Sequence, residues 1–202
     1  MIDLLEGNVS RETYEKLQQF VQLVEKWNPK INLVSKASIS DIWERHILDS
    51  IQLFNIAPKT GKWVDLGSGG GFPGIVVAIM AYGDQTKHHV TLVESDQRKS
   101  VFLRTAIREL GLNAKVISDR VESIAPLEAD IISARALSDL SLLLEYSHLH
   151  LLPSGVALFP KGERWEKEHS GAQQLWSYTC EPIKSTTNPS AAVLKIKDIA
   201  RV

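Results

Sequence analysis

The first 60 residues carry an apolar pattern that recurs every three or four positions, which is typical of amphipathic helices. The first predicted helix follows a candidate cap at Ser10 and is expected to end at Pro29. The second is expected over residues 42–54, behind Ser38 and Asp41, which have the spacing of a capping box. The apolar positions are Tyr14, Leu17, Phe20, Val21, Val24 and Trp27 in the first helix and Ile42, Trp43, His46, Ile47, Ile51 and Phe54 in the second.

From residue 62 onward the pattern changes to short apolar runs that alternate with amphipathic segments. This alternation is typical of parallel strands buried on both faces, so we expect an α/β fold with helices on both sides of one sheet. Gly111 is placed to end one of these helices. Residues 186–190 predict a turn that joins the last two strands into an antiparallel hairpin. The expected strands are 63–66, 89–94, 114–118, 130–133, 156–159, 177–184 and 191–199, and the expected helices are 73–82, 97–110, 138–152 and 163–176.

The composition is that of a single domain with a sizeable core. The chain has 202 residues, of which 44% are hydrophobic and 23% are charged, and we expect one domain over 1–202. No apolar run approaches the length of a membrane span, and Asp3 and Glu6 interrupt the apolar start, unlike in a signal peptide. The single cysteine, Cys180, excludes an internal disulfide, so a reducing cytoplasm is the expected location.

A glycine-rich turn follows the first predicted strand. Glycines between a strand and a helix permit positive φ angles and let a ligand reach the backbone. Counted from Gly69, the run also satisfies the dinucleotide pattern G-x-G-x-x-G, but the first glycine after the strand is Gly67, and from there position six is Phe72. The pattern that remains, Asp65-x-Gly67-x-Gly69-x-Gly71, is the one seen in class I methyltransferases that bind S-adenosylmethionine. We expect Asp65 near the cationic end of that cofactor.

Polar residues follow three further strands, at the edge where open α/β sheets bind their ligands. Glu94 ends the second strand, where a carboxylate can accept hydrogen bonds from a ribose with two free hydroxyls. NAD and S-adenosylmethionine both carry such a ribose. After the third strand, the loop with Val121 and Glu122 can offer backbone N–H groups and a carboxylate to an adenine. Arg135 follows the fourth strand and is expected to face the same crevice.

Other polar residues have ordinary structural interpretations. His46 falls on the apolar stripe of its helix, where a single histidine is more often a hydrogen-bonded core residue than a catalyst. Arg45 and Asp49 have the spacing of an i,i+4 ion pair. We expect no metal site, because the remaining candidate histidines have no acid or thiol partner at ligand spacing. These histidines are His88, His89, His148 and His150.

Taken together, the motifs resemble one family closely, the bacterial small-subunit ribosomal RNA guanine-N7 methyltransferases known as RsmG or GidB. The resemblance covers most of the chain. Many methyltransferases share the glycine motif, whereas the helical motif Arg-His-Ile-Leu-Asp-Ser at 45–50 is far more specific. The other matching segments are 27–33, 65–74, 120–122, 134–136 and 160–162.

The resemblance implies a class I, Rossmann-like methyltransferase fold, with a seven-stranded sheet over 62–202 and an N-terminal helical extension over 1–58. It also implies S-adenosylmethionine as the cofactor and a guanine in the decoding region of 16S ribosomal RNA as the target. The cofactor site that it implies consists of Gly67, Phe72, Val121, Glu122 and Arg135, to which the strand-end positions add Asp65, Gly69, Gly71 and Glu94.

Methylation of guanine N7 requires little acid–base catalysis by protein side chains. Guanine N7 carries a free lone pair and no proton, so its methylation requires no strong general base. Holding the reacting atoms in line can by itself be worth ~7–11 kcal/mol. In A-form RNA the groove that holds N7 is deep and narrow, so the target base has to be unpaired or extruded. The candidates for holding the guanine or nearby phosphates are Arg135, Arg45, His46 and Lys161.

The net charge of −1 leaves no extended basic face for naked RNA. We therefore expect a monomer that acts on 16S ribosomal RNA within a small ribosomal subunit or its precursor. Two other functions stay open. An NAD-dependent oxidoreductase shares the glycine loop and Glu94, but the glycine register and the lack of a Tyr-x-x-x-Lys pattern disfavour it. A noncatalytic ribosomal RNA assembly factor is disfavoured because the glycine loop costs backbone entropy with little packing in return.

Overall fold

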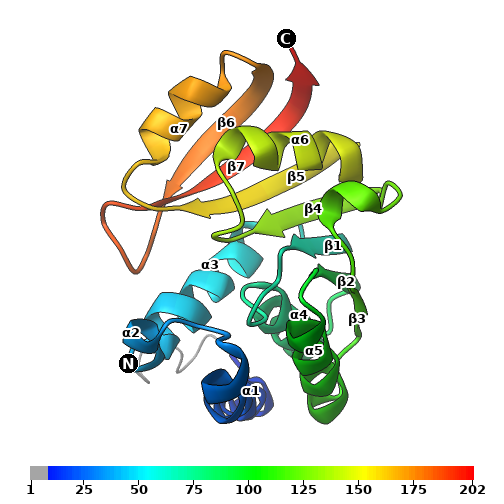
Figure 1. Ribbon diagram of the computed structural model, residues 1–202, viewed down its shortest axis with the longest axis vertical. Coiled ribbons are helices and arrows are strands. Elements are labelled where there is room, and N and C mark those ends of the chain that lie inside the picture. Colours follow the sequence, from blue (N-terminus) through cyan, green and yellow to red (C-terminus); the bar gives the residue numbers. More distant parts are fainter. Residues whose placement is uncertain (1–8) are drawn as a thin grey trace.

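Seven strands form one sheet in the order β3-β2-β1-β4-β5-β7-β6 (Figure 1). The computed structural model describes residues 9–202, so Asp3 and Glu6 lie outside it. Strands β1 to β5 are parallel, whereas β7 pairs antiparallel with β5 and with β6, which confirms the expected terminal hairpin. The strands are β1 Gly61–Leu66, β2 His88–Val93, β3 Ala114–Ile117, β4 Ala129–Ala134, β5 Leu151–Lys161, β6 Trp176–Lys184 and β7 Ala192–Arg201.

Helices cover both faces of the sheet, as the apolar pattern predicts. Successive side chains of a strand point to opposite faces, so Trp63 of β1 packs in the cluster with α1, α3, α4 and α5, while Val64 packs in the cluster with α6. Figure 1 shows these two groups of helices in the lower and upper halves of the view. The helices are α1 Arg11–Ile31, α2 Lys36–Ile39, α3 Asp49–Ile56, α4 Gly74–Gly83, α5 Gln97–Leu110, α6 Leu140–His150 and α7 Trp165–Ala172, with a π-helix η2 Trp43–Leu48 and a 3₁₀ turn η3 Val121–Ser123.

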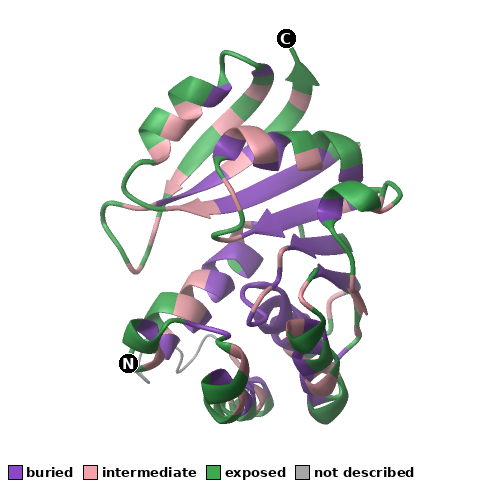
Figure 2. Cartoon of the chain, in the orientation of Figure 1, coloured by how far each residue is buried: buried purple, intermediate pink, exposed green. Residues whose placement is uncertain are grey.

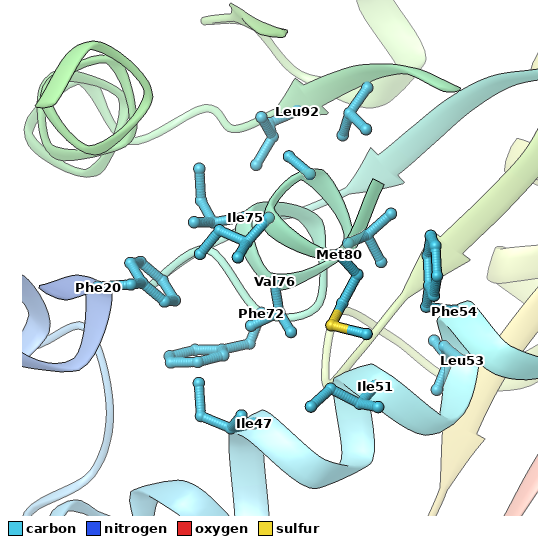
Figure 3. Packing of buried hydrophobic residues seen from close by; sticks show 14 of the residues in the cluster. Phe20, Ile47, Ile51, Leu53, Phe54, Phe72, Ile75, Val76, Met80 and Leu92 are labelled. Carbon is cyan, nitrogen blue, oxygen red and sulfur yellow. The ribbon is translucent and has the colours of Figure 1, made fainter. Parts of the chain in front are cut away.

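The helix α4 is at the centre of the larger core. Its residues 74–81 are all buried, because α1, α3 and the sheet surround it. Figure 3 shows Ile75, Val76 and Met80 of α4 between Phe20 of α1 and Ile51 of α3. Most residues of β1 and β4 and the middle of β5 are also buried, whereas α5 and α7 expose their outer faces (Figure 2). The amino-terminal helices are therefore part of the main core and hold the glycine loop that begins α4.

The central strand β1 ends level with its two neighbours. Leu66 pairs with Val93 of β2 and with Ala134 of β4. Because these strands are parallel, the chain leaves the sheet at one edge after all three of them. The residues that follow the three strand ends are Gly67, Glu94 and Arg135.

The expectation that Pro29 ends the first helix is wrong, because α1 continues to Ile31. The helix end is instead closed by Asn28. Its backbone carbonyl accepts the N–H of Asn32, which has a left-handed φ of 50°, and its Oδ1 accepts the N–H of Val34 at 2.9 Å. A proline in the last turn removes only one hydrogen bond, and this closure compensates for it.

The second predicted helix is also different from the expectation. Residues 43–48 form a π-helix that precedes α3, and the expected capping box does not form. Ser38 lies inside the short helix α2, where its hydroxyl donates to the carbonyl of Ser35 at 3.0 Å. The hydrogen bonds of a π-helix span five residues, so residues four apart no longer lie above one another. π-helical turns are frequent at functional sites, and this one contains Arg45 and His46.

The bounds of the other elements differ from the expectation by a few residues at each end, as is usual for fraying termini. The largest change is in β5, which begins at Leu151, directly after α6, rather than at 156. Within residues 9–202, none of the helices combines the length and the apolar character needed to cross a membrane.

Candidate functional site

A cavity of about 1220 Å³ opens at the carboxyl ends of the parallel strands. This is the edge at which open α/β sheets bind their ligands. The glycine loop, the strand ends after β2 and β4, η2, η3 and the connection between β6 and β7 all contribute to its wall. The predicted site residues that line it are Arg45, His46, Gly67, Gly69, Phe72, Glu94, Val121, Glu122, Arg135 and Lys161.

Most glycines of the loop are needed because neighbouring protein atoms leave no room for a Cβ atom. A Cβ at Gly71 would lie 2.7 Å from Cγ1 of Ile75, and one at Gly70 would lie 2.8 Å from the carbonyl oxygen of Leu33. Gly69 is the exception, because it has a φ of 53° and its nearest contact would be 3.8 Å away. The sequence-based explanation, that glycines let a ligand approach, therefore applies to Gly69, whereas Gly71 does not line the cavity.

Glu94 holds the glycine loop against the end of β2. Its Oε2 accepts the backbone N–H of Gly69 at 2.7 Å, and its Oε1 accepts the N–H of Asp96 at 2.7 Å. The side chain is buried yet lines the cavity. Each carboxylate oxygen has a second lone pair, so Glu94 can still accept hydrogen bonds from two ribose hydroxyls. Glu94, which is predicted to bind the ribose, therefore also stabilises the glycine loop.

Asp65 lies behind the cavity wall and not in it. The residue is fully buried, its Oδ1 accepts the hydroxyl of Ser133 at 2.8 Å, and its Oδ2 accepts the N–H of Gly74 at 3.2 Å. Trp63 Nε1–H donates to the same serine oxygen at 2.9 Å. Burial raises the pKa of the Asp65 carboxyl to about 6. These contacts let Asp65 hold the start of α4 beneath the loop, and its expected place near the cationic end of the cofactor stays a prediction.

Arg135 connects the end of β4 to the π-helix. One guanidinium nitrogen donates to the backbone carbonyl of Arg45 at 3.0 Å, and the guanidinium carbon lies 5.4 Å from the ring centroid of Phe72. Burial lowers the pKa of Arg135 from its usual value, which still leaves the group charged at neutral pH. The next residue, Ala136, has a φ of 53°, a conformation that costs a non-glycine residue about 1–2 kcal/mol. Such backbone strain is typical of functional sites.

His46 is not the hydrogen-bonded core residue that its place on the apolar stripe predicts. Both ring nitrogens are buried, and neither has a hydrogen-bond partner within residues 9–202. The ring stacks on Phe72, with centroids 4.9 Å apart. Burial, followed by the charges of Arg135 and Arg45, lowers the pKa of His46 to about 3. At pH 7 the imidazole beside the cavity is therefore neutral, and its two unpaired ring nitrogens are covered by protein atoms. Such a pair of buried, unsatisfied polar atoms is unusual and is found at functional positions.

The ion pair expected between Arg45 and Asp49 does not form, because the π-helical turn separates positions i and i+4. Asp49 instead accepts a hydrogen bond from the hydroxyl of Thr187, in the connection between β6 and β7. The amide of Gln52 holds the same connection, donating to Lys184 O at 2.7 Å and accepting the N–H of Thr186 at 3.1 Å. The sequence predicts only a turn at these residues.

Lys161 lines the cavity, but its ammonium group is bonded to other residues of the protein. Its ammonium donates to Glu168 at 2.7 Å and to the carbonyl of Ser138 at 2.8 Å, and only 9% of its side chain is exposed. Glu168 in turn accepts the N–H of Leu140 at the start of α6. These bonds use the ammonium to join the start of α6 to α7, and the contact of Lys161 with the substrate stays a prediction. In the sequence, the signal for this ion pair is Glu168, which lies seven residues after Lys161.

The loop after β3 is the part of the site nearest to the expectation. Val121 and Glu122 begin the 3₁₀ turn η3 and line the cavity, as predicted. The backbone carbonyl of Val121 accepts a hydrogen bond from the ring of the buried His150 at 2.9 Å. This bond anchors the turn to α6 and keeps the Glu122 carboxylate, which Tyr146 contacts at 3.4 Å, at the mouth of the cavity.

Comparison with known proteins shows the family of this chain. A family model described as GidB, rRNA small subunit methyltransferase G, matches residues 13–192. The chain belongs to the GidB family. A relative from Ruegeria pomeroyi is 55% identical over 195 residues, which cover 96% of both chains. A relative from Gluconobacter oxydans is 46% identical over 194 residues, or 96% of this chain and 98% of the relative. Both carry the name Ribosomal RNA small subunit methyltransferase G.

Solved structures share the fold of this GidB protein at low sequence identity. The structure of M. jannaschii TYW2 in complex with AdoMet has a TM-score of 0.56 at 18% identity and covers 86% of this chain and 80% of that chain. A TehB-like SAM-dependent methyltransferase from Corynebacterium glutamicum has a TM-score of 0.57 at 13% identity and covers 89% and 98%. These likenesses confirm the predicted class I, Rossmann-like fold.

Proposed function

We propose that this GidB protein transfers a methyl group from S-adenosylmethionine to N7 of a guanine in small-subunit ribosomal RNA. The observation that carries the proposal is the composition of one cavity. It is lined by the glycine loop, which the buried Glu94 carboxylate fixes, and by the cluster of His46, Phe72 and Arg135. The glycine loop suits a nucleoside cofactor, and the cluster suits an extruded base.

The residues around the glycine loop fit S-adenosylmethionine. Gly69 leaves open space above the loop backbone, and Glu94 has free lone pairs for the ribose. The turn with Val121 and Glu122 lines the same cavity, where it can contact the adenine. When bound, the cofactor supplies a methyl group on a positively charged sulfur. Gly67 and Phe72 also line the cavity.

The cluster of His46, Phe72 and Arg135 provides orientation rather than base catalysis. Guanine N7 has no proton to lose, and the neutral His46 is suited to hydrogen bonding and stacking instead of proton removal at pH 7. Arg135 is held by the Arg45 carbonyl and by the ring of Phe72, so its remaining N–H groups are fixed in direction. We propose that Arg135, His46 and Arg45 hold the guanine or its phosphates, and that alignment of the reacting atoms contributes most of the rate enhancement.

The surroundings of the cavity agree with a structured RNA substrate. Arg45, Lys99 and Arg120 line the cavity and can contact phosphates, whereas the net charge of the chain is only −1. We propose that the protein acts as a cytoplasmic monomer, and as one domain, on the small ribosomal subunit or its precursor. No observation favours the NAD-dependent or the noncatalytic alternative for this member of a methyltransferase family.

Two measurements test the proposed function. Calorimetry is expected to detect binding of S-adenosylmethionine and none of NAD. Small subunits from cells that lack the gene are then incubated with the protein and radiolabelled S-adenosylmethionine, and labelled N7-methylguanosine is mapped by chemical cleavage. Arg135→Ala, checked for folding by circular dichroism, is the inactive control. Label absent from small-subunit ribosomal RNA, or found at another base atom, would contradict the proposal.

A further inference from the structure

The connection between β6 and β7 lines the cavity and is fixed there by hydrogen bonds to side chains of α3. Gln52 of α3 bonds to the backbone of Lys184 and Thr186 through both ends of its amide. Thr187 bonds to Asp49, one turn before Gln52 on the same side of α3. These contacts join positions more than 130 residues apart in sequence, since Thr187 and Asp49 are separated by 138 residues. A connection held in this way has a defined position beside any bound base.

Asp49 has an unused acceptor in this wall. Its Oδ1 accepts the Thr187 hydroxyl, and within residues 9–202 its Oδ2 has no hydrogen-bond partner, while the residue lines the cavity. Burial raises the pKa of Asp49, while the hydrogen bond from Thr187 and the charges of Arg135 and Arg45 oppose this rise. Neither arginine forms an ion pair with Asp49 among the described residues. A half-buried carboxylate oxygen that faces a cavity is expected to meet an N–H donor of a ligand.

We propose that Asp49 is the specificity-determining residue that reads the Watson–Crick edge of the target guanine, accepting hydrogen bonds from N1–H and the exocyclic N2 amine. The proposal rests on the proposed function, because it concerns the base that enters this same cavity. Enzymes that extrude a base commonly read it by hydrogen bonds to its Watson–Crick edge. Recognition of that edge leaves N7, on the opposite side of the ring system, free to react.

Guanine is the base that this arrangement of charges favours. Its Watson–Crick edge presents two adjacent N–H donors for a carboxylate, and the O6 acceptor beside them suits an arginine. Adenine has an acceptor at N1, which a carboxylate repels, and uracil has a single N–H between two carbonyl groups. Asp49, with the charges of Arg135 and Arg45 nearby, therefore favours a donor-rich edge next to a carbonyl.

Thr187 is a positioning residue in this proposal, because it fixes the orientation of the Asp49 carboxylate without being required to touch the base. This difference gives the test a matched control. Thr187→Val removes the hydroxyl and keeps the volume of the side chain, so it weakens the orientation of the carboxylate but leaves both of its oxygens available.

The experiment compares guanosine with inosine, which lacks the N2 amine, at the mapped target position in reconstituted small subunits. For the wild-type protein, inosine is expected to lower kcat/KM by roughly 10- to 100-fold, the effect of one hydrogen bond to a charged group. Asp49→Ala is expected to be slower on guanosine and to treat the two bases alike. Thr187→Val is expected to be slower, chiefly through KM, and still to discriminate between them.

Equal rates of the wild-type protein on guanosine and inosine, or full discrimination by Asp49→Ala, would overturn the role of Asp49 while leaving the proposed function intact. Failure of the wild-type protein to methylate guanosine subunits at all would instead remove the proposed function. If Asp49→Ala does not fold, Asp49→Asn keeps the shape of the side chain and exchanges one acceptor for a donor. That variant is expected to lose discrimination in the same direction, and full discrimination by it counts against the proposal.

Discussion

The imidazole of His46 stacks on the ring of Phe72, with centroids 4.9 Å apart and planes 28° from parallel. This contact joins the π-helix of the amino-terminal region to the glycine loop of the methyltransferase core. Phe72 also packs on Phe20 of α1, with centroids 5.1 Å apart, and lies beneath Arg135. One aromatic side chain thus supports both candidate base-contacting residues, and the packing of the amino-terminal helices determines where they lie.

Replacing Phe72 by leucine is expected to lower the free energy of unfolding by roughly 1–2 kcal/mol and to reduce methylation more than this loss explains. The physical reason is that His46 and Arg135 lose the ring that orients them. Urea denaturation and initial rates measure the two effects. Phe102→Leu is the matched control, because Phe102 stacks on Phe20 in the same core without contacting either base-contacting residue. Comparable activity losses in the two variants would contradict the orienting role.

Glu94→Gln is expected to weaken binding of S-adenosylmethionine by at least about tenfold, because one carboxylate acceptor becomes an amide donor facing a backbone N–H. The affected partners are the N–H groups of Gly69 and Asp96. Calorimetry measures the affinity. Asp96→Ala serves as the control, since it removes the cap of α5 and about 1 kcal/mol of stability at a residue that does not line the cavity. Unchanged affinity in Glu94→Gln would argue against the ribose contact.

The pH dependence of stability is expected to reveal His46. Its pKa is about 3 in the folded protein, below the ordinary value of 6.5, so between these values the unfolded chain binds more protons. The free energy of unfolding contributed by His46 is therefore fully present above pH 6.5 and falls by at most about 1.4 kcal/mol per pH unit as the solution is acidified.

The difference between wild type and His46→Gln isolates this effect. Wild type is expected to lose roughly 2–3 kcal/mol relative to the variant between pH 6.5 and 4.5, measured by urea denaturation. Asp65, whose raised pKa of about 6 acts in the opposite direction, is present in both proteins and cancels in the difference. His148→Gln, at an exposed position of α6, is the control. Parallel pH profiles for wild type and His46→Gln would show that the imidazole is not buried as described.

Lys161→Met is expected to lower the free energy of unfolding by roughly 1–3 kcal/mol, because Glu168 is left without its cation in a partly buried position. The double variant Lys161→Met with Glu168→Gln is expected to regain part of this loss, since the amide oxygen can still accept the N–H of Leu140. Thermal unfolding and methylation are measured on both. A double variant that is stable and yet inactive would support the predicted role of Lys161 in substrate binding.

Periodicity and motif spacing were sufficient to predict the sheet, the terminal hairpin and the edge at which the cavity opens. Gly67, Glu94 and Arg135 could be placed at one site because they follow parallel strands, whose carboxyl ends necessarily meet. The same reasoning did not predict the protein partners of Asp65, which lies two residues before Gly67 and is turned into the core, where it accepts hydrogen bonds from Ser133 and Gly74.

The sequence by itself determined which residues lie at the binding edge of this GidB protein, because local propensity and strand direction act over short separations along the chain. Only the tertiary structure decided what those residues contact. Thr187 reaches Asp49, Gln52 reaches Lys184, and Lys161 is neutralised by Glu168. Such partners depend on how α3, α6, α7 and the last hairpin pack around the sheet, and the free energy of that packing is a property of the whole core.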